Sequence, residues 1–300
     1  MDRLEAMTTL LAVVDTGSLS AASRRLHTPL TTVSRRISEL EAHLRTRLLN
    51  RTTRRLTLTD AGNAYVAACR RITEQVEEAE RAAAGEYQAP RGELTVTAPM
   101  VFGRVHLVPV IAGFMEAYPD IKLDLRLSDR VLDLQEEHVD VAVRIGELPD
   151  SAMLARKLGT LRRIVCASPD YLERRGVPGR PEDIAAHDCV IFRGFERPDG
   201  WVFAGKSGTA TVPVRSRITL DTAEAVVEAG IAGMGLIRVF CYHVVPTIRQ
   251  GKLKSLLVDF ELAGPPVHIL HPGGGLMPLK VRAFLDYSTA RLQARLAASP

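Results

Sequence analysis

The sequence predicts an α/β protein with an N-terminal winged helix-turn-helix and a doubly wound C-terminal domain of two lobes. Three observations support this prediction: positive charge is concentrated in residues 24–55, one apolar stripe runs through residues 60–86, and strands alternate with helices from residue 93 onward. The chain has 300 residues, enough for two domains or three small ones with well-buried cores.

Arginine is unevenly distributed along the chain. Between Arg24 and Arg55, nine arginines stand against two glutamates, a local balance of +7, whereas the whole chain carries +4. The remaining residues therefore sum to −3. A basic patch confined to one small element is typical of a nucleic-acid-binding module. Genomic base composition would explain why arginine replaces lysine, but it would not explain the clustering.

Apolar spacing and capping residues predict the first two helices. Apolar residues recur every three or four positions over residues 4–14, the pattern of an amphipathic helix. Gly17 can end that helix in the left-handed conformation, and Ser18 can cap the next one. This second helix, over residues 19–26, is short and rich in alanine, so another helix can approach it closely.

A third helix is predicted over residues 30–44, with Thr28 as its N-cap and Pro29 as its first residue. One face is apolar, and the other carries hydroxyl groups and a guanidinium, which suit phosphates and base edges in a major groove. A short helix, a turn and a longer helix form the helix-turn-helix arrangement. The DNA contacts predicted on this helix are Thr31, Thr32, Ser34, Arg35 and Ser38.

A two-stranded wing is predicted directly after the helices. Residues 56–59 alternate between apolar and polar side chains, and the polar residues 50–53 form the pivot of the hairpin. Arginines near its tip can reach the DNA backbone or the adjacent minor groove. The predicted contacts are Arg51, Arg54 and Arg55, and the DNA-binding domain spans residues 1–59.

Residues 60–86 form a predicted linking helix with one continuous stripe of small and apolar side chains. A single helix of this length cannot bury such a stripe alone, which favours pairing with a second copy of the chain. The alternative is that the stripe packs on its own chain. Residues 85–92 are interpreted as a hinge, so the linker and dimerisation segment spans residues 60–91.

Alternating strands and helices in residues 92–300 predict parallel sheets covered by helices on both faces. The chain is expected to cross between two lobes near residues 160–166 and 264–270, and a short helix is expected over residues 131–137. The predicted boundaries are 92–162 with 268–300 for the first lobe, and 163–267 for the second.

Ligands in such sheets bind at the carboxyl ends of strands, near helix N-termini. The candidate effector-binding residues in these positions are Ala98, Pro99, Met100, Val101, Arg144, Ile145, Gly146, Asp221 and Thr222. Two alternatives stay open: Thr222 only caps its helix, or Arg144 pairs with a local acid such as Glu147. The glycines of residues 230–235 precede a strand, so they are interpreted as a helix-to-strand turn and not as a phosphate-binding loop.

No catalytic constellation, metal site or cofactor motif is apparent, and the chain is expected not to be an enzyme. Its four cysteines are far apart and form no C-x-x-C pair, which favours buried or inert thiols over a metal site; one redox-sensing cysteine is the minority interpretation. No apolar run approaches the ~20 residues that cross a bilayer, and the N-terminus does not look like a signal peptide. A cytoplasmic protein is therefore expected.

With these residues, the chain resembles the LysR-type transcriptional regulators over essentially its full length. The most specific motifs are Gly17-Ser18-Leu19-Ser20-Ala21-Ala22, Val33-Ser34-Arg35, Leu40-Glu41, Leu48, Arg51-x-x-Arg54, Leu58-Thr59 and Ala61-Gly62. The later motifs fit the family's effector domain with less specificity: Leu107-x-Pro109, Tyr118-Pro119, Asp140-Val141-Ala142 and Gly233-x-Gly235-Leu236.

The resemblance implies a winged helix-turn-helix, a dimerising linker helix and a two-lobed effector domain like the periplasmic binding proteins. The implied partners are double-stranded promoter DNA, a small-molecule effector and further copies of the chain, as a homodimer or a dimer of dimers. By position, Ser34, Arg35, Arg51 and Arg54 match the family's DNA contacts.

Three departures from the family pattern concern contact positions. Residues 29–32 are Pro-Leu-Thr-Thr where the family often has Ser-Gln-Pro-Ala, so a base-contacting glutamine is absent. Leu49 replaces the usual phenylalanine before the wing. The loop at residues 98–100 lacks the serine or threonine with which many relatives bind a carboxylate, which favours a more apolar effector or none.

Three functions are therefore weighed. The leading one is a DNA-binding regulator controlled by a small ligand. A solute-binding protein would use the lobes alone, but the arginine cluster and the lack of an export signal disfavour it. An enzyme with an appended DNA-binding domain is disfavoured because no catalytic cluster is apparent.

Overall fold

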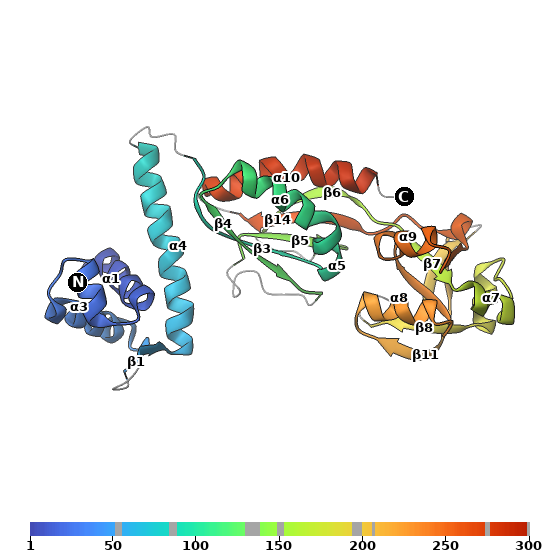
Figure 1. Ribbon diagram of the computed structural model, residues 1–300, viewed down its shortest axis with the longest axis horizontal. Helices are drawn as coiled ribbons and strands as arrows, with labels where there is room; N and C mark the ends of the chain where they lie inside the picture. The colour runs from blue at the N-terminus through green and yellow to red at the C-terminus, as the bar shows by residue number, and fades with distance from the viewer. Residues whose placement is uncertain are drawn as a thin grey trace. The chain divides into compact units, whose positions relative to one another are not determined.

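The computed structural model describes residues 1–51, 56–83, 89–129, 139–148, 153–193, 200–205, 208–273 and 277–298. Contacts divide the chain into two compact units, residues 1–89 and 90–300 (Figure 1). Each unit has its own hydrophobic core and is described by itself.

The N-terminal unit is a helix-turn-helix followed by a wing and a long helix. Its described elements are α1 (Arg3–Thr16), α2 (Leu19–Arg25), α3 (Leu30–Leu44), β1 (Leu49–Arg51), β2 (Leu56–Leu58) and α4 (Asp60–Ala83). The two wing strands are antiparallel. Gly17, with φ of 69°, ends α1, and the Ser18 hydroxyl accepts a hydrogen bond from the Ala21 N–H at the start of α2. The predicted winged helix-turn-helix is confirmed.

The residues predicted to cap and to begin α3 are wrong. The Thr28 hydroxyl donates to the Leu26 carbonyl oxygen at 3.1 Å and does not cap the helix. Pro29 is the N-cap residue rather than the first helical residue, and no side chain caps this end. The first N–H groups of α3 are therefore left without a side-chain acceptor from the cap position, at the end of the helix where anions bind favourably.

The core of the N-terminal unit joins all four helices and the wing. Its buried members are Ala6, Leu10, Ala12, Val13, Ala22, Val33, Ile37, Leu40, Leu48, Leu49, Val66 and Cys69. A side chain at Gly62 would place its Cβ 2.1 Å from the Leu48 carbonyl oxygen, so only glycine lets α4 approach the wing this closely. This contact explains why the sequence has glycine in the first turn of α4.

The apolar stripe of α4 is divided between two environments. Tyr65 is half-buried and packs against the core of its own unit, beside the buried Val66 and Cys69. Ile72, about two turns after Tyr65 on the same stripe, keeps 40% of its surface exposed. The first part of the stripe therefore packs on its own chain, whereas in the later part Ile72 and Ala79 are exposed and Val76 is half-buried.

The C-terminal unit contains two five-stranded sheets, with strand orders β4-β3-β5-β14-β6 and β11-β8-β12-β7-β13. The first sheet consists of β3 (Gly92–Ala98), β4 (Ile121–Leu127), β5 (Val141–Ile145), β6 (Met153–Thr160) and β14 (Pro266–Pro272). The second consists of β7 (Arg163–Ala167), β8 (Asp188–Phe192), β11 (Arg215–Leu220), β12 (Leu236–Phe240) and β13 (Lys254–Leu256). We call the first sheet with its helices lobe I and the second with its helices lobe II.

The helices of lobe I are α5 (Met100–Phe102), the π-helical turn η1 (Gly103–Leu107), α6 (Val108–Ala117) and α10 (Leu279–Ala297). Those of lobe II are α7 (Pro169–Arg175), η2 (Pro181–Ala186), α8 (Ala223–Ile231), α9 (Cys241–Arg249) and η3 (Val258–Phe260), with a hairpin of β9 (Trp201–Gly205) and β10 (Gly208–Val212). Figure 1 shows α6 and α10 side by side on the first sheet. The Phe114 and Phe284 rings meet there edge to face, with centroids 5.1 Å apart.

The predicted parallel arrangement holds for only part of each sheet, and both sheets are mixed. β3 is parallel to β4 and β5, but β14 is antiparallel to both β5 and β6, because this strand returns from lobe II in the opposite direction. Lobe II is mixed in the same way, with β7 antiparallel to β12 and β13. The elements β6, β9, β10, β13 and α9 were not predicted from the sequence. The helix predicted over residues 131–137 lies outside the described residues.

One helical stretch, Met100–Ala117, is long and apolar enough to cross a membrane by length and composition. This is weak evidence for a membrane span, because a core helix passes the same test. In the structure, Phe102, Leu107 and Phe114 of this stretch are fully buried in the core of the C-terminal unit. The π-helical turn lies in its middle, at Gly103, where an added Cβ would lie 2.1 Å from the Leu127 side chain.

Candidate nucleic-acid interface and lobe junction

The polar face of α3 presents most of the predicted DNA contacts to solvent. Thr31, Arg35 and Ser38 are exposed, whereas Thr32 and Ser34 are half-buried. The Arg35 Nε lies 3.8 Å from a Glu39 carboxylate oxygen, beyond hydrogen-bond distance, and its side chain is 71% exposed. The guanidinium therefore keeps its donors available for a phosphate or a base edge.

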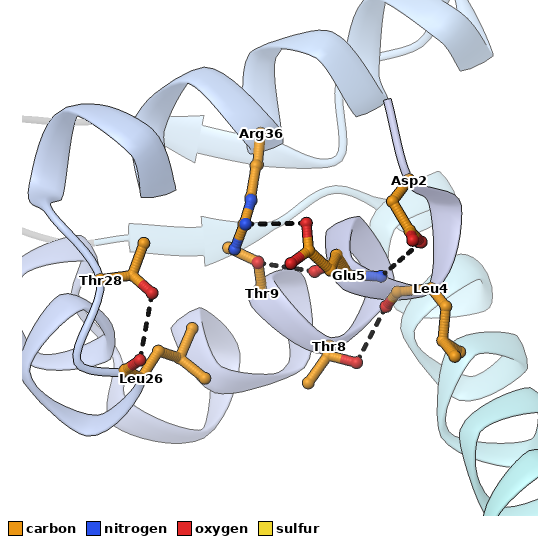
Figure 2. Close-up of a pocket in the computed structure, with 8 residues that line it drawn as sticks. All are labelled: Asp2, Leu4, Glu5, Thr8, Thr9, Leu26, Thr28 and Arg36. Atoms are coloured by element: carbon orange, nitrogen blue, oxygen red, sulfur yellow. Dashed lines mark hydrogen bonds and ion pairs between the residues drawn. The ribbon is translucent and has the colours of Figure 1, made fainter.

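Arg36, the next residue, does not share this face. Its Nη2 donates to Glu5 of α1 at 2.7 Å, and its side chain is only 23% exposed. Figure 2 shows this pair among the residues that line a pocket, together with residues of α1 and of the turn between α2 and α3. The volume of this pocket is about 340 Å³. The arginine cluster seen in the sequence therefore contains structural members as well as exposed ones.

Glu41 positions the wing, a role that the sequence analysis did not assign. Its Oε1 accepts hydrogen bonds from the N–H groups of Leu48 and Leu49, at 2.8 and 3.0 Å. These bonds tie the end of α3 to the first wing strand. Residues 52–55, the Arg51 side chain and therefore all three predicted wing contacts lie outside what the structure describes.

The predicted effector loop after β3 is only partly accessible. Ala98 and Val101 are buried, Pro99 is the N-cap of α5, and Met100 is 41% exposed. The Met100 N–H donates to Oδ1 of Asp129 at 2.9 Å. A carboxylate from this chain thus lies at the N-terminus of the helix, and the sequence analysis had not singled it out.

Arg144 of β5 has no acidic partner within the described residues, so the suggested pairing with Glu147 is wrong. Its Nη1 makes a long 3.4 Å contact with the Val143 carbonyl oxygen, and its Nη2 is buried without a hydrogen bond. Burial lowers the pKa of this guanidinium. Ile145 is half-buried, and Gly146 has φ of 113°, which favours glycine.

At the start of α8, the alternative interpretation of Thr222 is supported. Its hydroxyl accepts a hydrogen bond from the Ala225 N–H at 3.4 Å, which makes it the helix cap. Asp221 is exposed in the same loop. Gly233 and Gly235 lie between α8 and β12 with positive φ, which confirms the helix-to-strand turn predicted there.

The two lobes of the C-terminal unit meet through an aromatic cluster that the sequence analysis missed. The Tyr242 ring of lobe II lies 6.0 Å from the Phe102 ring and 5.3 Å from the His106 ring of lobe I, centroid to centroid. Arg104 of lobe I lies 3.6 Å from Glu224 of lobe II. Residue spacing along the sequence could not have indicated these contacts, because they join elements more than 100 residues apart.

Two histidines at this junction, the buried His106 and the half-buried His243, have buried ring nitrogens that make no hydrogen bond. Both ring nitrogens of His106 and the Nδ1 of His243 make no hydrogen bond. Burial, followed by repulsion from Arg295, lowers the pKa of His106 to about 4. Burial, followed by repulsion from Arg104, lowers the pKa of His243 to about 3. Both imidazoles are neutral at physiological pH.

Two family models match the chain and together cover most of it. Residues 4–63 match the bacterial regulatory helix-turn-helix protein of the lysR family, and residues 87–293 match the LysR substrate binding domain. A transcriptional regulator from Xanthomonas campestris pv. campestris is 38% identical over 93% of this chain and 83% of its own length.

Solved structures agree with the family models. CrgA, a LysR-type transcriptional regulator from Neisseria meningitidis, is 33% identical and superposes with a TM-score of 0.61 over 96% of this chain and 98% of its own. The full-length regulator LysG from Corynebacterium glutamicum, solved with its effector Arg bound, has a TM-score of 0.57 over 97% of this chain and 98% of its own. At 23% identity, this second likeness shows the fold alone.

Proposed function

Because this chain belongs to the LysR family of DNA-binding transcriptional regulators, we propose that it contacts promoter DNA through α3 and the wing and that a small molecule between its lobes controls this binding. The observation that supports this most directly is the polar face of α3, where Thr31, Arg35 and Ser38 are exposed and the Arg35 guanidinium lies 3.8 Å from its nearest carboxylate oxygen. Thr31, Thr32, Ser34, Arg35 and Ser38 are the proposed contacts on α3, and Arg51, Arg54 and Arg55 those on the wing.

The uncapped N-terminus of α3 supports a binding mode in which this end of the helix points toward the DNA. Anionic groups are favoured at a helix N-terminus, and here no side chain caps it. Leu30, at the first position, is 45% exposed and offers an apolar contact such as a thymine methyl group accepts. These features replace the glutamine that many relatives have nearby.

We further propose that α4 pairs with the α4 of a second copy. The exposed Ile72 and the small residues along the same stripe would be covered in such a pair. A dimer presents two helix-turn-helix units to two half-sites, which raises affinity without new contacts in either unit.

The effector is proposed to bind where the two lobes meet. The protein is proposed to act in the cytoplasm, where its promoter DNA lies. The candidate loops at residues 98–101, 144–146 and 221–222 lie at strand ends of the two sheets. A ligand that contacts both lobes can favour one arrangement of the lobes over another. The resulting change in the affinity of the protein for DNA cannot exceed the difference between the ligand's affinities for the two arrangements.

The experiment is a footprint of the full-length protein on the intergenic DNA beside its own gene, at fixed physiological salt. We expect a protected region on this DNA, and we expect that protection to persist when random DNA of equal length is added as competitor. We also expect the affinity of the protein for this DNA to change when a small organic molecule that acts as the effector is added. Equal affinity for both DNAs would reject specific recognition. Unchanged specific binding across a broad set of small molecules would reject control by an effector.

A further inference from the structure

Three arginines of lobe II surround a single carboxylate. The side chain of Asp188, at the start of β8, is 14% exposed, and its oxygens lie 3.6 to 3.9 Å from nitrogens of Arg175, Arg215 and Arg217. These distances exceed the length of a hydrogen bond. Among the described residues, no other carboxylate lies within 4.0 Å of the three guanidinium groups. Three positive charges against one negative charge leave this cluster with a surplus of +2.

The strand β11 holds two of these arginines at the edge of the second sheet. Arg215 is the register partner of Asp188, and Arg217 is the residue that the register skips at a bulge between Ser216 and Ile218. The side chains of Arg215 and Arg217 are 70% and 68% exposed. Most N–H donors of both guanidinium groups are therefore open to an acceptor from solvent or from another molecule.

An exposed apolar side chain lies next to this cluster. Met234, in the turn between α8 and β12, is 50% exposed. On one side of it, the Gly233 carbonyl oxygen accepts a hydrogen bond from Nη2 of Arg174 at 3.3 Å. On the other side, a Cβ at Gly235 would lie 2.3 Å from the Asp188 carbonyl oxygen, so the turn runs directly against the start of β8. Met234 is thus placed between Arg174 and the arginines around Asp188.

These residues form one surface at the amino ends of parallel strands. Val177, two residues after Arg175, adds a second apolar side chain and is 66% exposed. We call this surface the arginine–methionine surface, and it consists of Arg174, Arg175, Val177, Arg215, Arg217 and Met234. Glu224 and Tyr242, which contact lobe I, follow the carboxyl ends of β11 and β12. Because β8, β11 and β12 are parallel, the surface lies at the opposite ends of these strands from the lobe junction.

We propose that the arginine–methionine surface binds an acidic segment of a partner protein, with carboxylates on the arginines and an apolar side chain against Met234. The surplus of positive charge is complementary to such a segment. Arginine and methionine are also the residue types that protein–protein interfaces favour. Nucleic-acid phosphates would use the arginines but would gain little from the exposed Met234 and Val177. The proposal goes beyond the proposed function, which assigns these residues no role.

The experiment measures peptide binding by fluorescence anisotropy on the full-length protein at fixed salt. The probe is a short labelled peptide of glutamate, aspartate and leucine, and its counterpart has glutamine and asparagine in place of the acids. We expect the acidic peptide to bind more tightly than the amide peptide. The double variant Arg215→Ala with Arg217→Ala should weaken binding of the acidic peptide by about tenfold. No DNA is present, so the result does not depend on promoter recognition.

Met234→Ser tests the apolar part of the surface without altering an ion pair, and it should weaken binding of the acidic peptide by about fivefold. Arg282→Ala is the matched control, because Arg282 of lobe I is equally exposed, at 71%, and has Asp286 as its carboxylate partner. Arg35→Ala is the control for the proposed DNA-binding face. Both controls should leave the affinity for the acidic peptide unchanged.

Three results would overturn the proposal. If the acidic peptide does not bind, the arginines serve only to keep the edge strand β11 from pairing with other strands. If it binds equally well to the Arg215→Ala and Arg217→Ala double variant, it binds elsewhere on the chain. If Met234→Ser has no effect while the double variant does, the surface attracts any polyanion, nucleic acid included, and does not select a protein segment.

Discussion

At the scale of single residues, neighbouring arginines of α3 have different tasks. Arg35 points to solvent with a loose ion pair, whereas Arg36 is bonded to Glu5 and holds α3 to α1. Helical geometry separates adjacent side chains by about 100°, so one faces the proposed DNA and the other faces the protein. The charge cluster alone could not separate these two roles.

Replacing Arg35 with alanine should weaken specific DNA binding by roughly 1–3 kcal/mol, because a base or phosphate contact is lost, and leave stability unchanged. Arg36→Ala should instead lower the free energy of unfolding, by about 0.2–1 kcal/mol for a partly exposed ion pair. Gel-shift titration at fixed salt and urea unfolding measure the two effects. Unchanged DNA affinity in Arg35→Ala would remove it from the proposed contacts.

His106 should make stability fall in mild acid. Its pKa is about 4 in the folded chain, below the ordinary value of 6.5, so the unfolded chain binds the proton first as the pH falls. The contribution is fully present above pH ~6.5 and declines below it, by at most about 1.4 kcal/mol per pH unit down to pH ~4.

The variant His106→Phe removes this titration and can retain the ring packing with Phe102 and Tyr242. Urea unfolding at pH 7 and pH 5 should therefore show a smaller loss of stability in the variant than in the unaltered protein. An identical loss in both would mean that His106 does not carry this pH dependence. His243 has a depressed pKa as well and leaves a residual slope.

At the scale of elements, periodicity predicted helices well and strands unevenly. The helices of the first 83 residues were predictable because each has apolar residues at helical spacing. Short strands such as β13, and the hairpin of β9 and β10, were missed because three to five residues carry too little periodic signal. α9 was missed because Pro246 inside it argues against a helix.

The exposed part of α4 gives the test of self-association. Ile72→Glu places a charge in the proposed helix–helix contact and should shift the protein from dimer to monomer in sedimentation at micromolar concentration. Arg71→Glu changes an exposed neighbour and should leave the dimer intact. A monomer in the unaltered protein would reject pairing through α4, as would an Ile72→Glu variant that still dimerises.

At the scale of the whole molecule, the lobe junction joins distant segments by one ion pair and one aromatic cluster. Arg104→Glu should destabilise the contact by placing two acids together, and the swap Arg104→Glu with Glu224→Arg should restore it. The coupling energy is expected to be about 0.2–1 kcal/mol, because both side chains are largely exposed. Urea unfolding of the four proteins measures it, and a coupling of zero would contradict the ion pair.

The sequence by itself determined the family, the helix-turn-helix and the polar face of α3, because these depend on local spacing and charge. Tertiary structure alone decided which arginines are structural, that β14 returns antiparallel, and that Asp129 lies at the start of α5. It also brought Phe102, His106 and Tyr242 together. These contacts join residues far apart in the chain, and only the packed chain brings such residues within reach of each other.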